Sequence, residues 1–333
     1  MVRTAPFHGA NRGSIPLEAT QEKASRHKCR DAFAVCLAIA IRRANMIGAM
    51  TFKDVLRAKL EHDLGFDFYT RQGGAPKTFA VKAKEPGMLC GGIFIMTIIR
   101  LVEEGFFLDD DAPGDNVKIT HRMEDGSRIA PGDIVAELQG DGEVLLKAER
   151  IICDILSELS GIATHTAEKV AAMGGVSVTL LDTRKGDPLM RSMWKYAVRV
   201  GGGMPHRAGF FDGVLIKDND IAVLGGVVSA IEGRTREAKH LTRVAIEVGD
   251  EETLKQVLSD GRADTILLDN MAPENLREAV SRIKASGRGY RIEASGVGER
   301  ALSEIAATGV GYISLSALTR GAPHLDISMK AES

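Results

Sequence analysis

The sequence predicts an α/β protein in which a mixed α+β domain precedes a series of alternating strands and helices. In the first half, short strand-like runs are separated by turn residues such as Pro131-Gly132. In the second half, apolar runs that are typical of buried parallel strands alternate with segments of helical periodicity. The 333 residues, 44% of them hydrophobic and 26% charged, are enough for two modest domains.

Residues 1–50 are interpreted as an N-terminal extension. Their basic residues outnumber the three acidic ones, Glu18, Glu22 and Asp31, and such a bias is typical of a transit peptide. The alternative, which we favour, is an extension that carries one helix from Asp31 to Met46, with Asp31 as its N-cap.

The α+β domain is expected over residues 51–148. Apolar residues from Phe52 to Leu64 recur at helical spacing, and Gly65 ends this first helix. A second, apolar helix is expected from Gly91 to Glu104. The strand-like runs are Thr78–Lys84, Val117–His121, Ile134–Leu138 and Gly142–Leu146.

A barrel-like domain is expected over residues 149–333, beginning with a helix from Glu149 to Leu159. The expected strands are Val176–Leu181, Gly213–Ile216, Val244–Val248, Thr265–Leu268, Tyr290–Ile292 and Tyr312–Leu315. Helices are expected between them, at Glu252–Leu258, Pro273–Ile283 and Arg300–Ala307. Six strands are few for a complete eight-fold barrel.

Charge and cysteine content exclude several classes of protein. The formal net charge of -2 predicts neither nucleic acid nor a membrane surface as a partner. The longest apolar stretch, Ala32 to Ile41, is about half of the roughly 20 residues that a membrane span needs. Four cysteines without a C-x-x-C pair indicate neither a disulfide framework nor a zinc site, so we expect a reduced, cytoplasmic protein.

Polar residues follow each predicted strand of the second domain, at the edge where ligands bind in parallel α/β sheets. The cations are Arg184, Lys185 and Lys217, and the carboxylates are Glu247 and Asp269. Any one of them alone is best explained as solvated surface. Together they predict one site for a dianionic substrate beside a sugar whose hydroxyls or metal are held by carboxylates.

Two further segments favour the same site. Three glycines, Gly201 to Gly203, precede His206 and Arg207, whereas a helix end needs only one glycine; the run predicts a backbone that approaches an anionic ligand. Ser295-Gly296 and Ser316 end the last two strands, where phosphate often binds in barrels.

These residues match the motifs of one family. Asp182-Thr183-Arg184-Lys185, the glycine run with His206-Arg207, Leu215 to Asn219, Leu267 to Asn270 and Glu293 to Gly296 resemble those of quinolinate phosphoribosyltransferases, in the same order. Upstream, Asp63-Leu64-Gly65, Pro131-Gly132-Asp133, Ala148-Glu149-Arg150 and Leu159 to Thr164 look like the same family's N-terminal domain and linking helix. The resemblance runs from about Thr51 to Ile327.

The resemblance implies a type II phosphoribosyltransferase fold, in which an open α+β sandwich domain is followed by an incomplete α/β barrel. It implies a pentosyltransferase that moves phosphoribose from phosphoribosyl pyrophosphate to quinolinate with decarboxylation, giving nicotinate mononucleotide, pyrophosphate and carbon dioxide for NAD biosynthesis. It also implies a homodimer or higher homo-oligomer in which Arg150 of one subunit completes the site of its neighbour.

The resemblance further assigns roles to single residues. The pyridine dicarboxylate would be held by Arg150, Arg184, Lys185, His206, Arg207 and Lys217. The ribose and phosphates would be held by Glu247, Asp269, Ser295, Gly296 and Ser316, with Mg at Glu247 and Asp269. The residues expected to act in catalysis are Lys185, Lys217 and Asp269.

The chain departs from the family's pattern on the ribose and phosphate side. The departures are Gly186 to Leu189 in place of Thr-Thr-Pro-Gly, Asp220 for His, Gly249 for Glu, and Val297 and Ser316 for Gly. They leave open a paralogue that acts on another heterocyclic acceptor. Two other classes also stay open: an aldolase that forms a Schiff base at Lys217, and a non-catalytic nucleotide-binding protein.

Overall fold

The computed structural model describes residues 51–65, 74–106, 116–298 and 301–332. The chain divides into two compact units, Met1–Thr51 and Phe52–Ser333. The fold described here is that of the second unit. The helix expected from Asp31 to Met46 lies outside the described residues.

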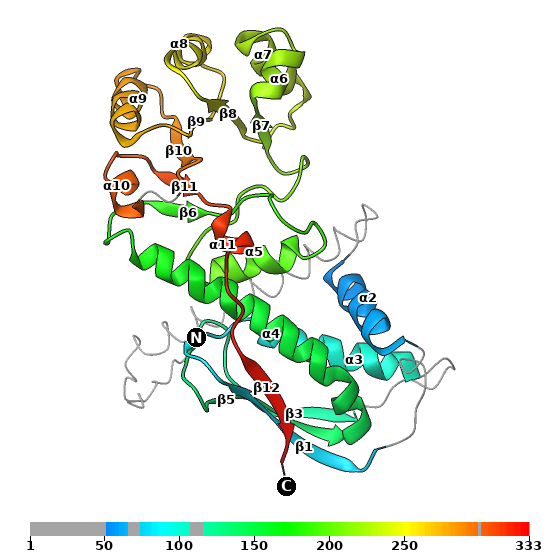
Figure 1. Cartoon of the computed structure of the whole chain (residues 1–333). Coiled ribbons are helices and arrows are strands. Elements are labelled where there is room, and N and C mark those ends of the chain that lie inside the picture. Colours follow the sequence, from blue (N-terminus) through cyan, green and yellow to red (C-terminus); the bar gives the residue numbers. More distant parts are fainter. Residues whose placement is uncertain (1–50, 66–73, 107–115, 299–300, 333) are drawn as a thin grey trace, which may run out of the picture. The chain divides into compact units, whose positions relative to one another are not determined.

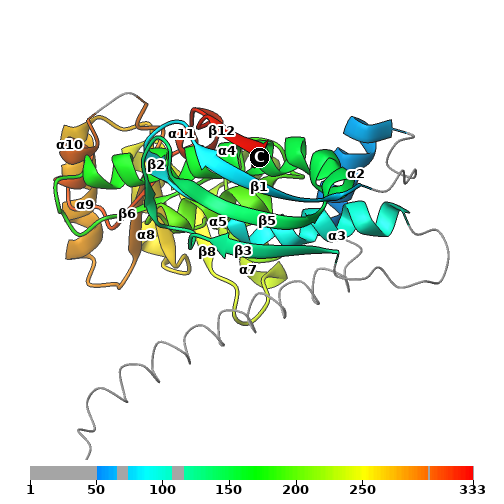
Figure 2. The ribbon, with the colours of Figure 1, turned by 90° about the horizontal axis from the view of Figure 1, so that it is seen from below.

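The first part of this unit is built on a four-stranded antiparallel sheet of order β12-β1-β5-β3. The predicted strands β1, β3 and β5 occur, and so do the helices expected before and after Gly65; η2 is a short 3₁₀ turn at the start of α3. The helix α4 contacts β1, β5 and β12, α3 packs against α4, and α2 packs against both helices, as Figures 1 and 2 show. The bounds are α2 Phe52–Leu64, β1 Pro76–Ala83, β2 Gly87–Met88, η2 Gly92–Phe94, α3 Ile95–Phe106, β3 Val117–Arg122, β4 Arg128–Ile129, β5 Ile134–Asp141 and β12 Ile327–Ala331.

The strand expected at Gly142–Leu146 is wrong, because these residues form the first turns of α4, Gly142–Ala171. The carboxylate of Asp141 accepts hydrogen bonds from the backbone N–H groups of Glu143 (2.9 Å) and Val144 (3.4 Å). An aspartate in this position satisfies N–H groups that a helix start leaves free, so it favours helix over the short alternating pattern that predicted a strand. The helix expected from Glu149 to Leu159 is the middle of α4.

The second part is built on a six-stranded parallel sheet of order β6-β11-β10-β9-β8-β7. All six predicted strands occur, and β8 has the predicted bounds. Its edge strands, β6 and β7, do not pair with each other, so the sheet stays an open, incomplete barrel. The bounds are β6 Thr179–Leu181, α5 Arg191–Val200, β7 Val214–Ile216, α6 Asp218–Val223, α7 Val227–Glu237, β8 Val244–Val248, α8 Glu251–Asp260, β9 Thr265–Asp269, α9 Pro273–Ala285, β10 Arg291–Ser295, α10 Leu302–Ala306, β11 Tyr312–Ser314 and α11 Ala317–Arg320.

The last strand, β12, was not predicted. After α11 the chain leaves the parallel sheet, runs along α4 and pairs antiparallel with β1, from Phe79 opposite Ala331 to Ala83 opposite Ile327 (Figure 1). A C-terminal strand therefore completes the N-terminal sheet and connects the two parts of the unit.

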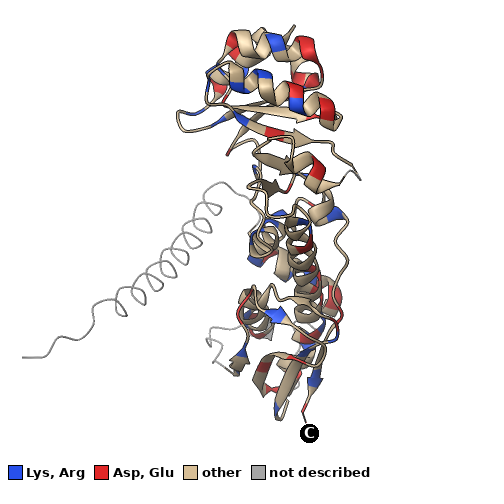
Figure 3. Ribbon diagram, turned by 90° about the vertical axis from the view of Figure 1, so that its left-hand side faces the viewer, with Lys and Arg blue, Asp and Glu red and all other residues tan. Residues whose placement is uncertain are grey.

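Both signs of charge occur in both parts of the unit (Figure 3). Within the described residues, no helix combines the length and the apolar character that crossing a membrane would require.

Candidate active site

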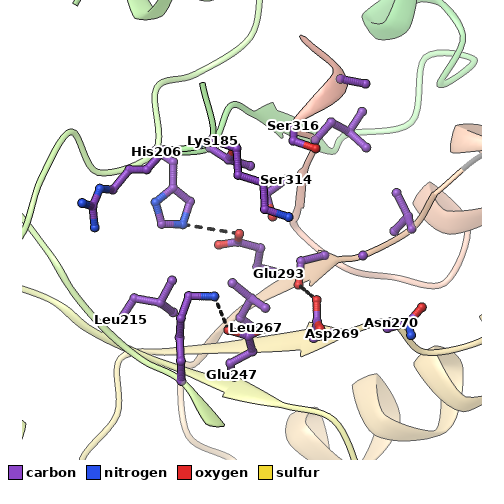
Figure 4. Close-up of a pocket in the computed structure, with 18 of the residues that line it drawn as sticks. Lys185, His206, Leu215, Glu247, Leu267, Asp269, Asn270, Glu293, Ser314 and Ser316 are labelled. Atoms are coloured by element: carbon purple, nitrogen blue, oxygen red, sulfur yellow. Dashed lines mark hydrogen bonds and ion pairs between the residues drawn. The ribbon is translucent and has the colours of Figure 1, made fainter. Parts of the chain in front are cut away.

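A cavity of about 700 Å³ lies at the carboxyl ends of the parallel strands. Ligand pockets in proteins commonly have volumes of about 300–1,000 Å³. It is lined by all but one of the predicted site residues: Arg184, Lys185, His206, Arg207, Lys217, Glu247, Asp269, Ser295, Gly296 and Ser316. In Figure 4, side chains from several different strand ends point into this one space. The predicted cations and carboxylates thus lie around one cavity.

A buried ion pair between Lys195 and Asp182 fixes the backbone of His206. Nζ of Lys195, on α5, lies 2.6 Å from Oδ1 of Asp182 and donates a second bond to the His206 carbonyl at 2.9 Å. The same Oδ1 accepts the His206 backbone N–H at 2.7 Å. Burial raises the pKa of Asp182 and lowers the pKa of Lys195, and in each case the opposite charge of the partner acts against that shift. The pair therefore holds the backbone on both sides of the histidine.

The imidazole of His206 has a defined orientation. Its Nδ1 accepts the backbone N–H of Arg207 at 2.8 Å, so as an acceptor Nδ1 carries no proton. Its Nε2 lies 3.4 Å from Oε1 of Glu293, a carboxylate on β10 that is 3% exposed (Figure 4). Within the described residues this oxygen is buried without a hydrogen-bond partner, although it faces the cavity. A buried acceptor without a donor calls for a ligand or water at that place.

Arg184 and Arg207 both lie close to one aromatic ring. The guanidinium carbon of Arg184 is 4.3 Å from the centroid of Phe210, and that of Arg207 is 5.2 Å from it. Burial and the like charge of Arg184 both lower the pKa of Arg207. Arg207 also donates to the Gly213 carbonyl at 3.0 Å.

Lys217 follows β7 and is tied to the next strand. Its Nζ lies 2.5 Å from Oε2 of Glu247, and its side chain is 48% exposed. Its backbone N–H donates to Asp220, whose other oxygen accepts two bonds from Arg234. The aspartate that replaces the family's histidine thus has a structural role here: it holds the start of α6 and is paired with α7.

The carboxylate of Asp269, at the end of β9, accepts the hydroxyl hydrogen of Ser295 at 2.6 Å (Figure 4). Gly296 follows with a φ of +64°, and a Cβ there would lie 2.9 Å from Asp269 Oδ1 and from the Asn270 nitrogen. Asn270 itself has a φ of 54°. These two strand ends are therefore closely packed, and glycine is the residue that fits between them.

Arg150 does not line the cavity of its own chain. It lies on α4 with its side chain 67% exposed, and Asp154 one turn on, at 3.7 Å, is its ion-pair partner. Because the structure contains one chain, the role of Arg150 in a neighbouring subunit stays a prediction.

Sequence reasoning missed three residues of this site: Lys195, Phe210 and the cavity-facing role of Glu293. Lys195 occurs in a helix whose other residues gave no sign of a buried charge, and Phe210 reads as an ordinary loop residue. Glu293 gave the clearer signal, because a carboxylate inside an apolar strand next to Ser295-Gly296 needs a partner.

The fold and the site define an α/β protein with a cavity of cations and carboxylates at the open end of an incomplete barrel, where small ligands bind in such folds. The chain matches the descriptions "Quinolinate phosphoribosyl transferase, N-terminal domain" over residues 65–160 and "Quinolinate phosphoribosyl transferase, C-terminal domain" over residues 162–330. The chain therefore belongs to the quinolinate phosphoribosyl transferase family.

Similar proteins carry consistent names. The chain is 37% identical to the probable nicotinate-nucleotide pyrophosphorylase [carboxylating] of Bacillus subtilis, over 75% of this chain and 81% of the relative. It is 35% identical to the nicotinate-nucleotide pyrophosphorylase [carboxylating] of Mycobacterium leprae, over 83% and 96%. The solved structure of the nicotinate-nucleotide pyrophosphorylase from Francisella tularensis is similar with a TM-score of 0.73 and 31% identity, over 84% and 96%.

These findings confirm the family, the fold class and the enzyme class, a pentosyltransferase, that the motifs predicted. The activity inferred from the motifs is also the one that the family name states.

Proposed function

We propose that this chain transfers the phosphoribosyl group of phosphoribosyl pyrophosphate to quinolinate and that the product loses one carboxylate. The products are nicotinate mononucleotide, pyrophosphate and carbon dioxide, a step of NAD biosynthesis. The observation that carries the proposal is the gathering of Arg184, Lys185, His206, Arg207 and Lys217 around one cavity that also contains Glu247, Asp269 and Glu293.

On the acceptor side, the basic side chains bind the two carboxylates of quinolinate. Guanidinium groups suit carboxylates because their planar N–H donors match the two oxygens. Closely spaced cations also favour the doubly charged form of the acceptor. The backbone of His206 is fixed by Lys195 and Asp182, and both arginines contact Phe210, so the groups proposed to hold the acceptor are themselves oriented.

On the donor side, Asp269, Ser295, Gly296 and Ser316 line the cavity where the ribose and phosphates would lie. The described residues contain no group of three His, Cys, Asp or Glu side chains that could hold a metal ion alone. Mg²⁺ is commonly bound by one or two carboxylates together with substrate phosphates, and Glu247 and Asp269 fit that arrangement. When bound, Mg²⁺ would neutralise the pyrophosphate leaving group.

The reaction then follows from charge. The ring nitrogen attacks C1 of the ribose as the bond to pyrophosphate breaks, and cations nearby, Lys185 and Lys217 among them, stabilise the negative charge that leaves. The nitrogen of the product is positive, so it stabilises the carbanion that remains when the adjacent carboxylate departs as carbon dioxide. A proton then takes the place of the lost carboxylate on that ring carbon. Glu293 Oε1, which contacts His206 Nε2 at 3.4 Å but has no hydrogen bond among the described residues, is placed to accept a sugar hydroxyl.

The test is an assay of the purified full-length protein with quinolinate, phosphoribosyl pyrophosphate and Mg²⁺, with nicotinate mononucleotide measured by chromatography and mass spectrometry. Lys217→Ala is the matched control. Product that forms only with another heterocycle would establish the paralogue instead. Donor binding by calorimetry without turnover of any pyridine carboxylate would establish a non-catalytic protein.

No observation favours the Schiff-base aldolase. Lys217 Nζ is paired with a carboxylate at 2.5 Å, and an ammonium group held in this way is not a nucleophile.

We also propose a homodimer, or a higher homo-oligomer, in which Arg150 acts in the site of the neighbouring subunit. Support comes from its high exposure and from its absence among the residues that line the cavity of its own chain. For location we propose the cytoplasm, where the buried free thiols of Cys90 and Cys153 stay reduced.

Complementation tests the role of Arg150. Co-expression of Arg150→Ala and Lys217→Ala chains with different tags gives, after two affinity steps, a mixed dimer. If Arg150 acts across the interface, one of the two sites is intact and the mixed dimer has about half of the wild-type activity. If Arg150 acts within its own chain, both sites are damaged and the mixed dimer is as inactive as its parents.

A further inference from the structure

Phe210 is a large apolar side chain in an unusual place. It is 79% exposed, so burial does not explain it. Its ring instead contacts the guanidinium groups of both Arg184 and Arg207, at 4.3 and 5.2 Å from the centroid. Both arginines line the cavity, and Phe210 itself does not.

Contact with an aromatic ring stabilises the two guanidinium groups. They carry like charges that repel each other, and the pKa of Arg207 is lowered by burial and then by Arg184. Nε of Arg184 is buried and has no hydrogen-bond partner among the described residues. The face of an aromatic ring attracts a cation, so a ring in contact with both guanidinium groups offsets part of their repulsion and restricts where they lie.

The loop that presents Phe210 is held on both sides. The carboxylate of Asp212 accepts the backbone N–H groups of Ala208 (2.7 Å) and Gly209 (2.9 Å), which closes a tight turn around Phe210. The guanidinium of Arg191, at the start of α5, donates to the carbonyls of Ala208 (3.3 Å) and Arg184 (3.2 Å). Arg191 therefore joins the Phe210 loop to the loop that carries the first arginine.

We propose that Phe210 is a positioning residue for acceptor binding, which holds Arg184 and Arg207 at a fixed spacing and orientation that matches a ring with two carboxylates. This inference rests on the proposed function. The arginines contact the acceptor, and Phe210 acts only through them. Their arrangement exists before the acceptor arrives, so less conformational entropy is lost on binding.

The test compares Phe210→Leu, which keeps an apolar side chain but removes the aromatic face, with Phe210→Tyr, which keeps the face. An exposed cation–π contact changes affinity by about two- to fivefold, so loss of two predicts a rise of about 5- to 30-fold in the KM for quinolinate. The KM for phosphoribosyl pyrophosphate is expected to stay unchanged in Phe210→Leu, and the melting temperature is expected to decrease by no more than about 2–4 °C. Phe210→Tyr is expected to behave as the wild type.

Phe211→Leu is the matched control, because this neighbouring ring is also largely exposed, at 63%, and lies over Gly209 instead of the arginines. It is expected to leave both KM values as they are. In inhibition assays with compounds that lack the ring nitrogen, Phe210→Leu should weaken benzene-1,2-dicarboxylate more than benzoate, because two guanidinium groups are displaced. Equal weakening of both inhibitors, or an unchanged KM for quinolinate, would overturn the proposal.

A second readout does not require turnover. Phenylglyoxal reacts with free guanidinium groups, and peptide mapping follows Arg184 and Arg207 separately. Faster modification of both in Phe210→Leu than in the wild type supports the proposal, and identical rates refute it. If the wild type does not act on quinolinate, the proposed function fails while this comparison still decides whether Phe210 holds the arginines.

Discussion

Replacement of Lys195 by methionine tests the buried ion pair that holds His206. Methionine is similar in length and removes the ammonium group that contacts Asp182 and the His206 carbonyl. The side chains of Asp182 and Lys195 are 1% and 8% exposed, so water cannot replace the lost partner. The variant leaves a carboxylate buried with only the backbone N–H of His206 to compensate it.

The expected loss of stability is large. Removal of one partner of a buried ion pair costs about 3–5 kcal/mol, because the other charge stays uncompensated. For a unit of this size about 2 °C of Tm corresponds to each kcal/mol, which predicts a decrease of about 6–10 °C. Lys195→Met combined with Asp182→Asn removes both charges and is expected to recover most of the loss.

The loss should depend on pH in a defined direction. Burial already raises the pKa of Asp182, and without Lys195 only the smaller effects of His206 remain to lower it. A group whose pKa is raised in the folded state adds stability below its unfolded pKa and loses that contribution as pH rises through the folded pKa. The destabilisation is therefore smallest near the ordinary aspartate pKa of about 4 and largest at neutral pH.

The assay is urea or thermal unfolding followed by circular dichroism at several pH values, with the KM for quinolinate measured in parallel. We expect an increased KM, since the His206 backbone loses one anchor. A Tm equal to that of the wild type, or a deficit that does not change with pH, would refute this account of the pair.

Four other substitutions separate the functions of the cavity. Lys217→Ala and Arg184→Ala should each abolish measurable turnover with little change in Tm, because an exposed ion pair such as that of Lys217 contributes about 0–1 kcal/mol; normal turnover in either would contradict the cation cluster. Asp269→Asn should increase the KM for the donor and the Mg²⁺ concentration needed for half-maximal rate, while calorimetry shows unchanged quinolinate binding. Gly296→Ala should likewise increase the donor KM, because its Cβ would lie 2.9 Å from Asp269 Oδ1 at a φ of +64°.

The strand ends of the barrel were predictable because a parallel sheet gathers them in space. Apolar runs mark the strands, and whatever follows each run lies at the same edge. Arg184, Lys217 and Asp269 are far apart in the sequence, yet this rule alone places them around one cavity. A local pattern is therefore enough to predict a site residue when the topology of the sheet brings the strand ends together.

Other features depend on contacts that no local pattern encodes. The pairing of β12 with β1 joins residues about 250 positions apart, and a short apolar run gives no indication of its partner. Lys195 is buried only because α5 packs it over Asp182, and on sequence alone a lysine is expected to be exposed. The α4 start was mistaken for a strand because the capping bonds of Asp141 outweigh a five-residue alternation.

Some of the departures from the family pattern line the cavity and others do not, so their consequences for ligand binding differ. Gly249 does not line the cavity, and Asp220 is engaged by Arg234 and by the Lys217 backbone, so neither change removes a group that faces the ligand. Val297 and Ser316 do line it, at the ends of the two strands where phosphate is expected. The place to look for a change in substrate preference is therefore the binding of the donor phosphates. The cations proposed for the acceptor, except Arg150, all line the cavity, and in a screen of acceptors with a fixed donor we expect quinolinate to be preferred.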